Sequence, residues 1–212
     1  MSSTAVAVAE ILAALSYGER LAQRRADDTV VLAPDESARK QQQHVARREL
    51  ENATLIGARV RELGSVESEE RFRPFFDAFF ARSVPSDWLE AQTFHYLGDA
   101  LVRDFADVLV PLLDPVSAEV VRRALADRDE QDAFALDEIT RGTSDDPEAA
   151  ERIAAYARRI VGEALTQARR ALDETEALRS LLGDEEGEKR LLLDLLQRHR
   201  QRLERMGIEI VE

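Results

Sequence analysis

The stretch Val45-Ala-Arg-Arg-Glu49-Leu-Glu-Asn52 carries the pattern on which the fold prediction rests. Apolar residues recur around it every three or four positions, at Val45, Ile56 and Val60 among others. This spacing is typical of the buried face of an α-helix. Glu49 lies in the middle of that face. The stretch therefore predicts a helix that turns a carboxylate toward the protein core.

The same period runs through most of the chain, and strand patterns are nearly absent. We expect helices over about 4–25, 34–63, 85–112, 114–141, 147–182 and 184–206. Short loops join the first two helices and the next two, whereas residues 65–85 connect the pairs. Short loops favour antiparallel neighbours, and a single long crossover is typical of ferritin-like bundles. The sequence thus predicts an all-α, ferritin-like four-helix bundle with two additional C-terminal helices. We expect one domain over 1–212, with the core bundle at about 4–141 and the C-terminal helices at about 147–206.

The crossover contains five phenylalanines within nine positions: Phe72, Phe75, Phe76, Phe79 and Phe80. A solvated linker is rarely so apolar. We expect a short amphipathic helix that packs on the core, and an exposed surface for a partner or a lipid is the alternative.

Composition excludes several classes of protein. The chain has 212 residues, with 29 Lys and Arg against 42 Asp and Glu, and its net charge of −13 disfavours a general nucleic-acid binder. The absence of cysteine excludes disulfides, thiolate metal sites and cysteine nucleophiles. No run of about eighteen apolar residues is present, and the first ten residues lack the basic region of a signal peptide. We therefore expect a cytoplasmic protein without a membrane partner.

Three glutamates lie within the apolar faces of three different predicted helices: Glu19, Glu49 and Glu90. A buried carboxylate without a partner costs several kcal/mol. None of the residues three or four positions from these glutamates is cationic, so a helical ion pair explains none of them. Two explanations remain open. Either arginines reach in from other helices, or a metal ion gathers the carboxylates.

A combination of motifs carries a family resemblance. The motifs are Ser16-Tyr-Gly-Glu19, Ala46-Arg-Arg-Glu-Leu-Glu-Asn52, Pro85-Ser-Asp-Trp-Leu-Glu90 with Tyr96-Leu-Gly-Asp99, and Val161-Gly-Glu-Ala-Leu-Thr-Gln-Ala168. Over nearly the whole chain, they resemble actinobacterial ferritin-like proteins related to the tRNA-modifying non-haem di-iron hydroxylases. The resemblance implies a carboxylate-bridged di-metal site and an oxidation of a small molecule or a modified tRNA.

The resemblance also implies a set of metal ligands, but with two substitutions. Asn52 stands where the family has a histidine, and Asp127 to Glu130 stand where it has an acidic residue three positions before a second histidine. The implied ligands are Glu19, Glu49, Asn52, Glu90, Asp127 and Glu130. Because both imidazoles are missing, we expect iron or manganese to bind weakly or not at all.

The three histidines do not complete this set. His44 and His95 each lie five residues from a candidate glutamate, which separates the side chains by about 140° around a helix. His199 lies outside the bundle pattern. We expect all three at the surface or at an edge, although a π-bulge would bring His95 toward Glu90.

The function predicted from these observations is that of a ferritin-like binding or structural protein with a degenerate di-iron-type site. The alternative is a non-haem di-metal hydroxylase or oxidase, so the sequence does not decide whether the chain is an enzyme. Phosphate loops and nucleophile elbows are absent from the sequence. A homodimer is a candidate assembly, built through the leucines of the last helix: Leu191, Leu192, Leu195, Leu196 and Leu203. Nucleic acid is disfavoured as a partner, and tRNA stays open.

Overall fold

The computed structural model describes residues 3–64, 70–126 and 128–208. The helices are α1 (Ser3–Thr29), α2 (Glu36–Glu62), α3 (Arg73–Arg82), α4 (Trp88–Phe94), α5 (Ala100–Leu109), α6 (Pro115–Ala124), α7 (Asp129–Thr143), α8 (Pro147–Glu174), α9 (Glu176–Leu182) and α10 (Glu185–Arg205). Short 3₁₀ turns follow α1 and α5, at η1 (Val30–Leu32) and η3 (Val110–Leu112). A π-helical segment, η2 (His95–Asp99), joins α4 to α5. This architecture confirms the predicted all-α class.

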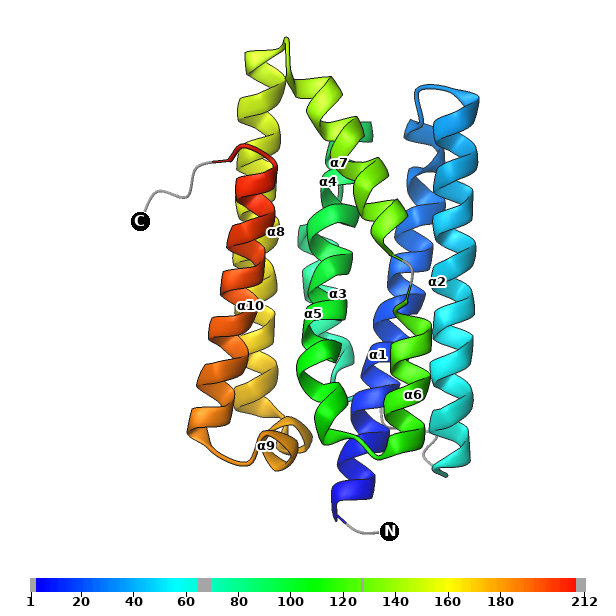
Figure 1. The fold of residues 1–212 in the computed structure, drawn as a ribbon, viewed down its shortest axis with the longest axis vertical. Coiled ribbons are helices and arrows are strands. Elements are labelled where there is room, and N and C mark those ends of the chain that lie inside the picture. The colour runs from blue at the N-terminus through cyan, green and yellow to red at the C-terminus, as the bar shows by residue number, and fades with distance from the viewer. Residues whose placement is uncertain (1–2, 65–69, 127, 209–212) are drawn as a thin grey trace.

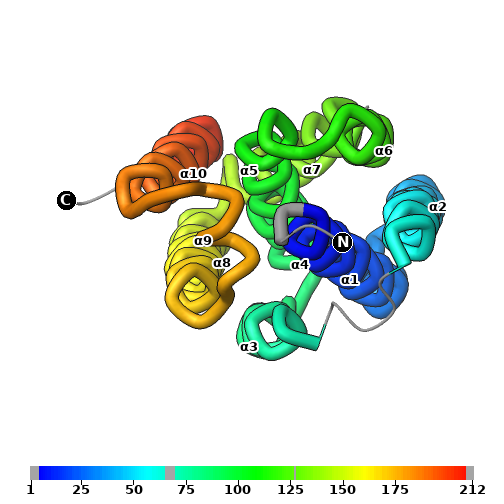
Figure 2. Tube along the Cα trace, turned by 90° about the horizontal axis from the view of Figure 1, so that it is seen from below, coloured from blue at the N-terminus to red at the C-terminus, as the bar shows by residue number. Residues whose placement is uncertain are grey.

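Helices α1, α2 and α6 form one group, α8 and α10 form another, and a continuous helical segment lies between the two groups (Figure 1, Figure 2). Helices α1 and α2 pack side by side as an antiparallel hairpin, and α6 lies against α2 (Figure 1). The segment made of α4, η2 and α5 lies in the middle, in contact with α1, α7, α8 and α10 (Figure 2). Helix α3 belongs to the long crossover and bridges α1 and α8. The chain thus has the predicted bundle with one long crossover, and α8 and α10 flank it.

Aspartates define where five of the helices begin. Each carboxylate accepts a hydrogen bond from a backbone amide in the first turn, which otherwise has no helical partner. The capping residues are Asp35, Asp87, Asp114, Asp146 and Asp184. Proline follows directly after Asp114 and Asp146, at positions where a helix does not need the missing N–H.

The predicted inner faces are confirmed in α1 and α2, where Ile11, Leu12 and Ile56 are fully buried. Of the crossover phenylalanines, four are buried against α1 and α8: Phe72, Phe75, Phe79 and Phe80. The prediction of a packed amphipathic helix is confirmed. The alternative of an exposed phenylalanine surface is wrong, because these rings are part of the core.

The π-helical segment changes which residues of the third predicted helix face inward. A π turn contains one residue more than an α turn, so the side chains after it rotate to new positions. Asp99 and Asp104 are buried as a result, whereas the predicted core residue Phe105 is half-buried. His95, which we expected at the surface or an edge, is only 2% exposed.

The fourth predicted helix, 114–141, is interrupted between α6 and α7. Arg128 is the N-cap residue of α7, and its side chain is buried. The carbonyl of Ala126, freed by the break, accepts a hydrogen bond from Arg48 at 2.8 Å. The prediction of one helix over 114–141 is therefore wrong. The chain breaks between α6 and α7, and the side chain of Arg128 is buried in the core at this break.

The helix predicted over 147–182 is interrupted as well. Thr175 has extended backbone angles (φ −115°, ψ 125°) and separates α8 from α9. Its hydroxyl donates to the Ala171 carbonyl at 2.6 Å, and its backbone amide donates to the same carbonyl at 3.0 Å.

Helix α10 packs against α5 and α8 through both leucines and charges. Leu191, Leu195 and Leu203 are buried. The fully buried carboxylate of Asp104 in α5 accepts hydrogen bonds from Arg202 of α10. His199, expected at the surface or an edge, is buried completely in this contact, and His44 is exposed as predicted.

None of the helices in the described part of the chain combines the length and the apolar character that a membrane span requires.

Candidate functional site in the centre of the bundle

Two of the candidate glutamates meet an arginine in the middle of the bundle. Glu19 of α1 and Glu49 of α2 are each 1% exposed. The Nη2 atom of Arg128 lies 2.8 Å and 3.0 Å from the two carboxylate oxygens of Glu19. The same nitrogen lies 2.9 Å from Oε2 of Glu49. Of the two explanations for the buried carboxylates, the one observed here is an arginine from another helix.

Asn52 completes this group on the α2 side. It lies one helical turn after Glu49, and its Nδ2 donates to Oε2 of Glu19 at 3.1 Å. The amide therefore holds Glu19 in place as a hydrogen-bond donor. We call Glu19, Glu49, Asn52 and Arg128 the central cluster.

The two carboxyl groups of the central cluster have pKa values that are shifted in opposite directions. Burial, together with the negative charge of Glu49, raises the pKa of Glu19 well above its usual value, against the opposing effect of Arg128. Burial alone would raise the pKa of Glu49 too. The Arg128 guanidinium and the hydrogen bond from Glu19 outweigh it and lower that pKa. Glu19 therefore holds its proton to higher pH than Glu49 does, and Arg128 lies against both carboxyl groups.

A second polar group lies next to the central cluster. His95 Nδ1 is 2.7 Å from Asp99 Oδ2, and His95 Nε2 is 2.6 Å from the amide nitrogen of Gln42. Because an amide nitrogen can only donate, His95 accepts at Nε2 and donates from Nδ1 to Asp99. Burial raises the pKa of Asp99, and the charge of Glu49 contributes to this shift. The charge of the central cluster therefore affects the protonation of Asp99 in the second polar group.

The other candidate ligands lie apart from the central cluster. Oε2 of Glu90 accepts from the Ser86 amide at 2.7 Å and from its hydroxyl at 2.8 Å, and Oε1 lies 3.7 Å from Arg152. Glu90, in the first turn of α4, is thus bound to Ser86 just before that helix and not to the other two glutamates. Glu130 is exposed at the start of α7, and Asp127 lies outside the described residues. The inward-facing positions there are Arg128 and Gln131, one residue later than expected.

The central cluster does not fit the di-metal centre that the resemblance implies. The Arg128 guanidinium bonds to both carboxylates and takes the position between them, and both nitrogens of His95 are engaged. Oε1 of Glu49 is the cluster's one buried oxygen without a partner, whereas a di-iron site needs several free ligands. Within residues 3–64, 70–126 and 128–208, no group of three or more His, Asp or Glu side chains is placed to hold a metal ion.

Sequence reasoning missed Arg128, Asp99 and Gln42. A weak signal existed for Asp99, which lies in the Tyr96-Leu-Gly-Asp99 motif of the resemblance. Arg128 and Gln131 have the three-residue spacing of the expected ligand pair, shifted by one position. Nothing in the local sequence singles out Gln42.

Comparison with known proteins agrees with this geometry at the level of the fold. No curated protein matches the chain. A family model described as a ferritin-like domain of actinomycetes matches residues 3–185, from the start of α1 to the first residue of α10. The match includes every residue of the central cluster. The chain therefore belongs to the actinomycete ferritin-like domain family.

Proposed function

We propose that this protein is a binding or structural member of its family, with a degenerate site in which one arginine stands in for the metal centre. The observation that carries the proposal is the hydrogen bonding of Arg128 Nη2 to both Glu19 and Glu49. An arginine is charged at every physiological pH, so the two buried carboxylates keep a cation whatever the metal supply.

Charge balance supports the same conclusion. Two divalent ions bring four positive charges, and ferritin-like sites meet them with about four carboxylates and two imidazoles. The central cluster offers two carboxyl groups, one with a raised pKa, and one amide. Placing metal ions there requires that Arg128 leave, and the raised pKa of Glu19 opposes ionisation of its carboxyl group. We therefore propose weak or no occupancy by iron or manganese.

The test is elemental analysis combined with titration of Mn²⁺ and Fe²⁺ into metal-free protein. We expect the purified wild type to contain less than one metal ion per chain and to show no saturable binding in the micromolar range. Two bound irons per chain, with the absorption of a carboxylate-bridged centre, would overturn the proposal. That result would favour the alternative, a di-metal hydroxylase or oxidase acting on a small molecule or a modified tRNA.

An arginine variant sharpens this test. Arg128→Ala removes the cation and leaves Glu19, Glu49 and Asn52 facing an open volume, so Mn²⁺ affinity should rise at least tenfold. The matched control is Arg152→Ala, which removes the arginine beside Glu90. This control should bind no more Mn²⁺ than the wild type. Equal binding by both variants would contradict the role assigned to Arg128.

We further propose a cytoplasmic protein that forms a homodimer through the outer face of α10. Leu193 and Leu196 are 65% and 48% exposed on that helix. Light scattering after chromatography tests the dimer, and Leu193→Glu should make the protein monomeric. The net charge of −13 argues against a nucleic-acid partner, including tRNA.

A further inference from the structure

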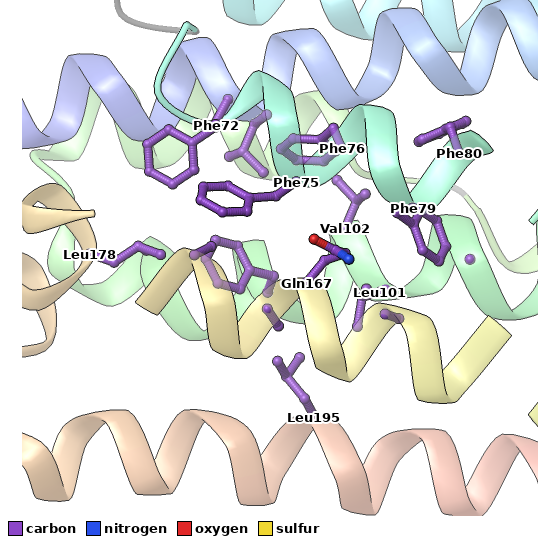
Figure 3. A pocket seen from close by; sticks show the side chains of 17 residues that line it. Phe72, Phe75, Phe76, Phe79, Phe80, Leu101, Val102, Gln167, Leu178 and Leu195 are labelled. Carbon is purple, nitrogen blue, oxygen red and sulfur yellow. The ribbon is translucent and has the colours of Figure 1, made fainter. Parts of the chain in front are cut away.

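A cavity of about 90 Å³ lies between α3 and α8. Figure 3 shows phenylalanines of the crossover on one side and α8 on the other, with Leu178 and Leu195 contributed by α9 and α10. The five crossover phenylalanines all line it. The cavity lies outside the central cluster, and the lining residue nearest in sequence to a cluster member is Leu15, four positions before Glu19.

The chemistry of the lining is almost wholly hydrocarbon. Gln167 is the one polar side chain among the residues that line the cavity. Its Nε2 donates to Glu163 at 2.6 Å, and its Oε1 accepts from Arg170 at 3.0 Å. Since each end of this amide already makes a hydrogen bond, the lining offers an occupant few polar partners. A water molecule, which needs two to four such partners, is poorly suited to this space.

The cavity arises where small alanine side chains of α8 face the large rings of the crossover phenylalanines. Ala164, Ala168 and Ala171 line the cavity from α8. Their spacing of four and three residues places them on one face of the helix, opposite the phenylalanines. Protein interiors contain few voids larger than a water molecule, because the atoms around a void lose packing contacts. A cavity bordered by four alanines and six phenylalanines is therefore suited to an apolar occupant.

We propose that this cavity binds a small uncharged apolar molecule, with the bulk of a short alkyl chain or a single ring. Apolar cavities of about 150 Å³ take up benzene or xenon. The present cavity is smaller, so a haem, a flavin or a long acyl chain does not fit. Phe76 and Phe105 are half-buried, which makes them the lining rings with room to move when a ligand enters. The site is independent of the metal question, because none of its residues belongs to the central cluster.

Two probes test the site on the full-length protein. Benzene should raise the melting temperature saturably, since a ligand that binds only the folded state stabilises it. Xenon should produce a saturable shift in the ¹²⁹Xe resonance. The variant Ala168→Leu places extra carbon atoms in the cavity and should weaken benzene binding at least tenfold.

The matched control is Ala155→Leu, which makes the same change at an exposed position of α8. It should keep the wild-type response to both probes. If Ala168→Leu fails to fold, Ala164→Val fills the same face of the helix and takes its place. The proposal is overturned if the wild type responds saturably to neither probe, or if the cavity variant responds as strongly as the Ala155→Leu control.

Discussion

The guanidinium of Arg128 lies 2.8 Å from the carboxylate of Glu19, although 109 residues separate the two along the chain. Burial of an ion pair contributes little net stability, because desolvation of both charges offsets their attraction. Removal of one partner is different, since it leaves the other charge buried and unpaired. Single substitutions in the central cluster should therefore change the free energy of unfolding.

Glu49→Gln should lower the free energy of unfolding by about 3–5 kcal/mol at neutral pH, because it leaves Arg128 without its ionised partner. Glu19→Gln is the matched control. Glutamine resembles the protonated form of Glu19, so this variant should stay within about 1 kcal/mol of the wild type. Urea unfolding of both variants checks the difference, and equal losses would contradict the assignment of the proton to Glu19.

The same two variants should respond to pH in opposite ways. The pKa of Glu49 is lower in the folded state than its ordinary 4.5, so its contribution to stability is present above pH 4.5 and is lost in acid. The deficit of Glu49→Gln should therefore shrink as the pH falls below 4.5. The pKa of Glu19 is raised, so the wild type loses stability relative to Glu19→Gln as the pH rises above 4.5. Thermal melts between pH 3 and pH 8 measure both trends, and parallel curves would count against them.

Asp104→Asn should loosen α10. The Asp104 carboxylate is fully buried and accepts hydrogen bonds from Arg202 and Arg198. We expect a loss of about 3 kcal/mol and faster proteolysis within α10. The control is Asp107→Asn, which removes an exposed carboxylate 3.1 Å from the same Arg198 and should cost less than about 1 kcal/mol. Similar losses in both variants would mean that Asp104 does not hold the helix.

His199→Leu should stabilise the protein, and most strongly in acid. Burial lowers the pKa of His199 from 6.5 to about 4, and neither ring nitrogen has a partner among the described residues. Between these pH values the unfolded chain binds a proton that the folded chain does not, so wild-type stability falls as the pH falls from 6.5 to 4. The difference corresponds to about 3 kcal/mol at pH 4. Melting curves of His199→Leu should lack this fall, and the exposed-site control His44→Leu should retain it.

The sequence predicts those parts of the fold that depend on local pattern. Helix period and aspartate caps are local: the buried faces of α1 and α2 follow the period, and α2 begins after the Asp35 cap. The π-helical segment and the interruption before α7 depend on tertiary packing, so periodicity does not indicate them. Glu90 shows why the partners of the candidate site residues are harder to predict from the sequence. Its partner, Ser86, is only four residues away, but a search for cations does not select a serine. The partner of Glu49 is 79 residues away, beyond any helical spacing.

The interruption between α6 and α7 has a consequence for synthesis on the ribosome. When only α1 and α2 have emerged, Glu19 and Glu49 lack the arginine that joins them in the finished protein. Close docking of this hairpin would then bring two carboxylates together without a cation, which is unfavourable. The centre of the bundle closes only after residue 128 has left the exit tunnel. We therefore expect the first hairpin of the nascent chain to stay loosely packed until more than half of the protein has been translated.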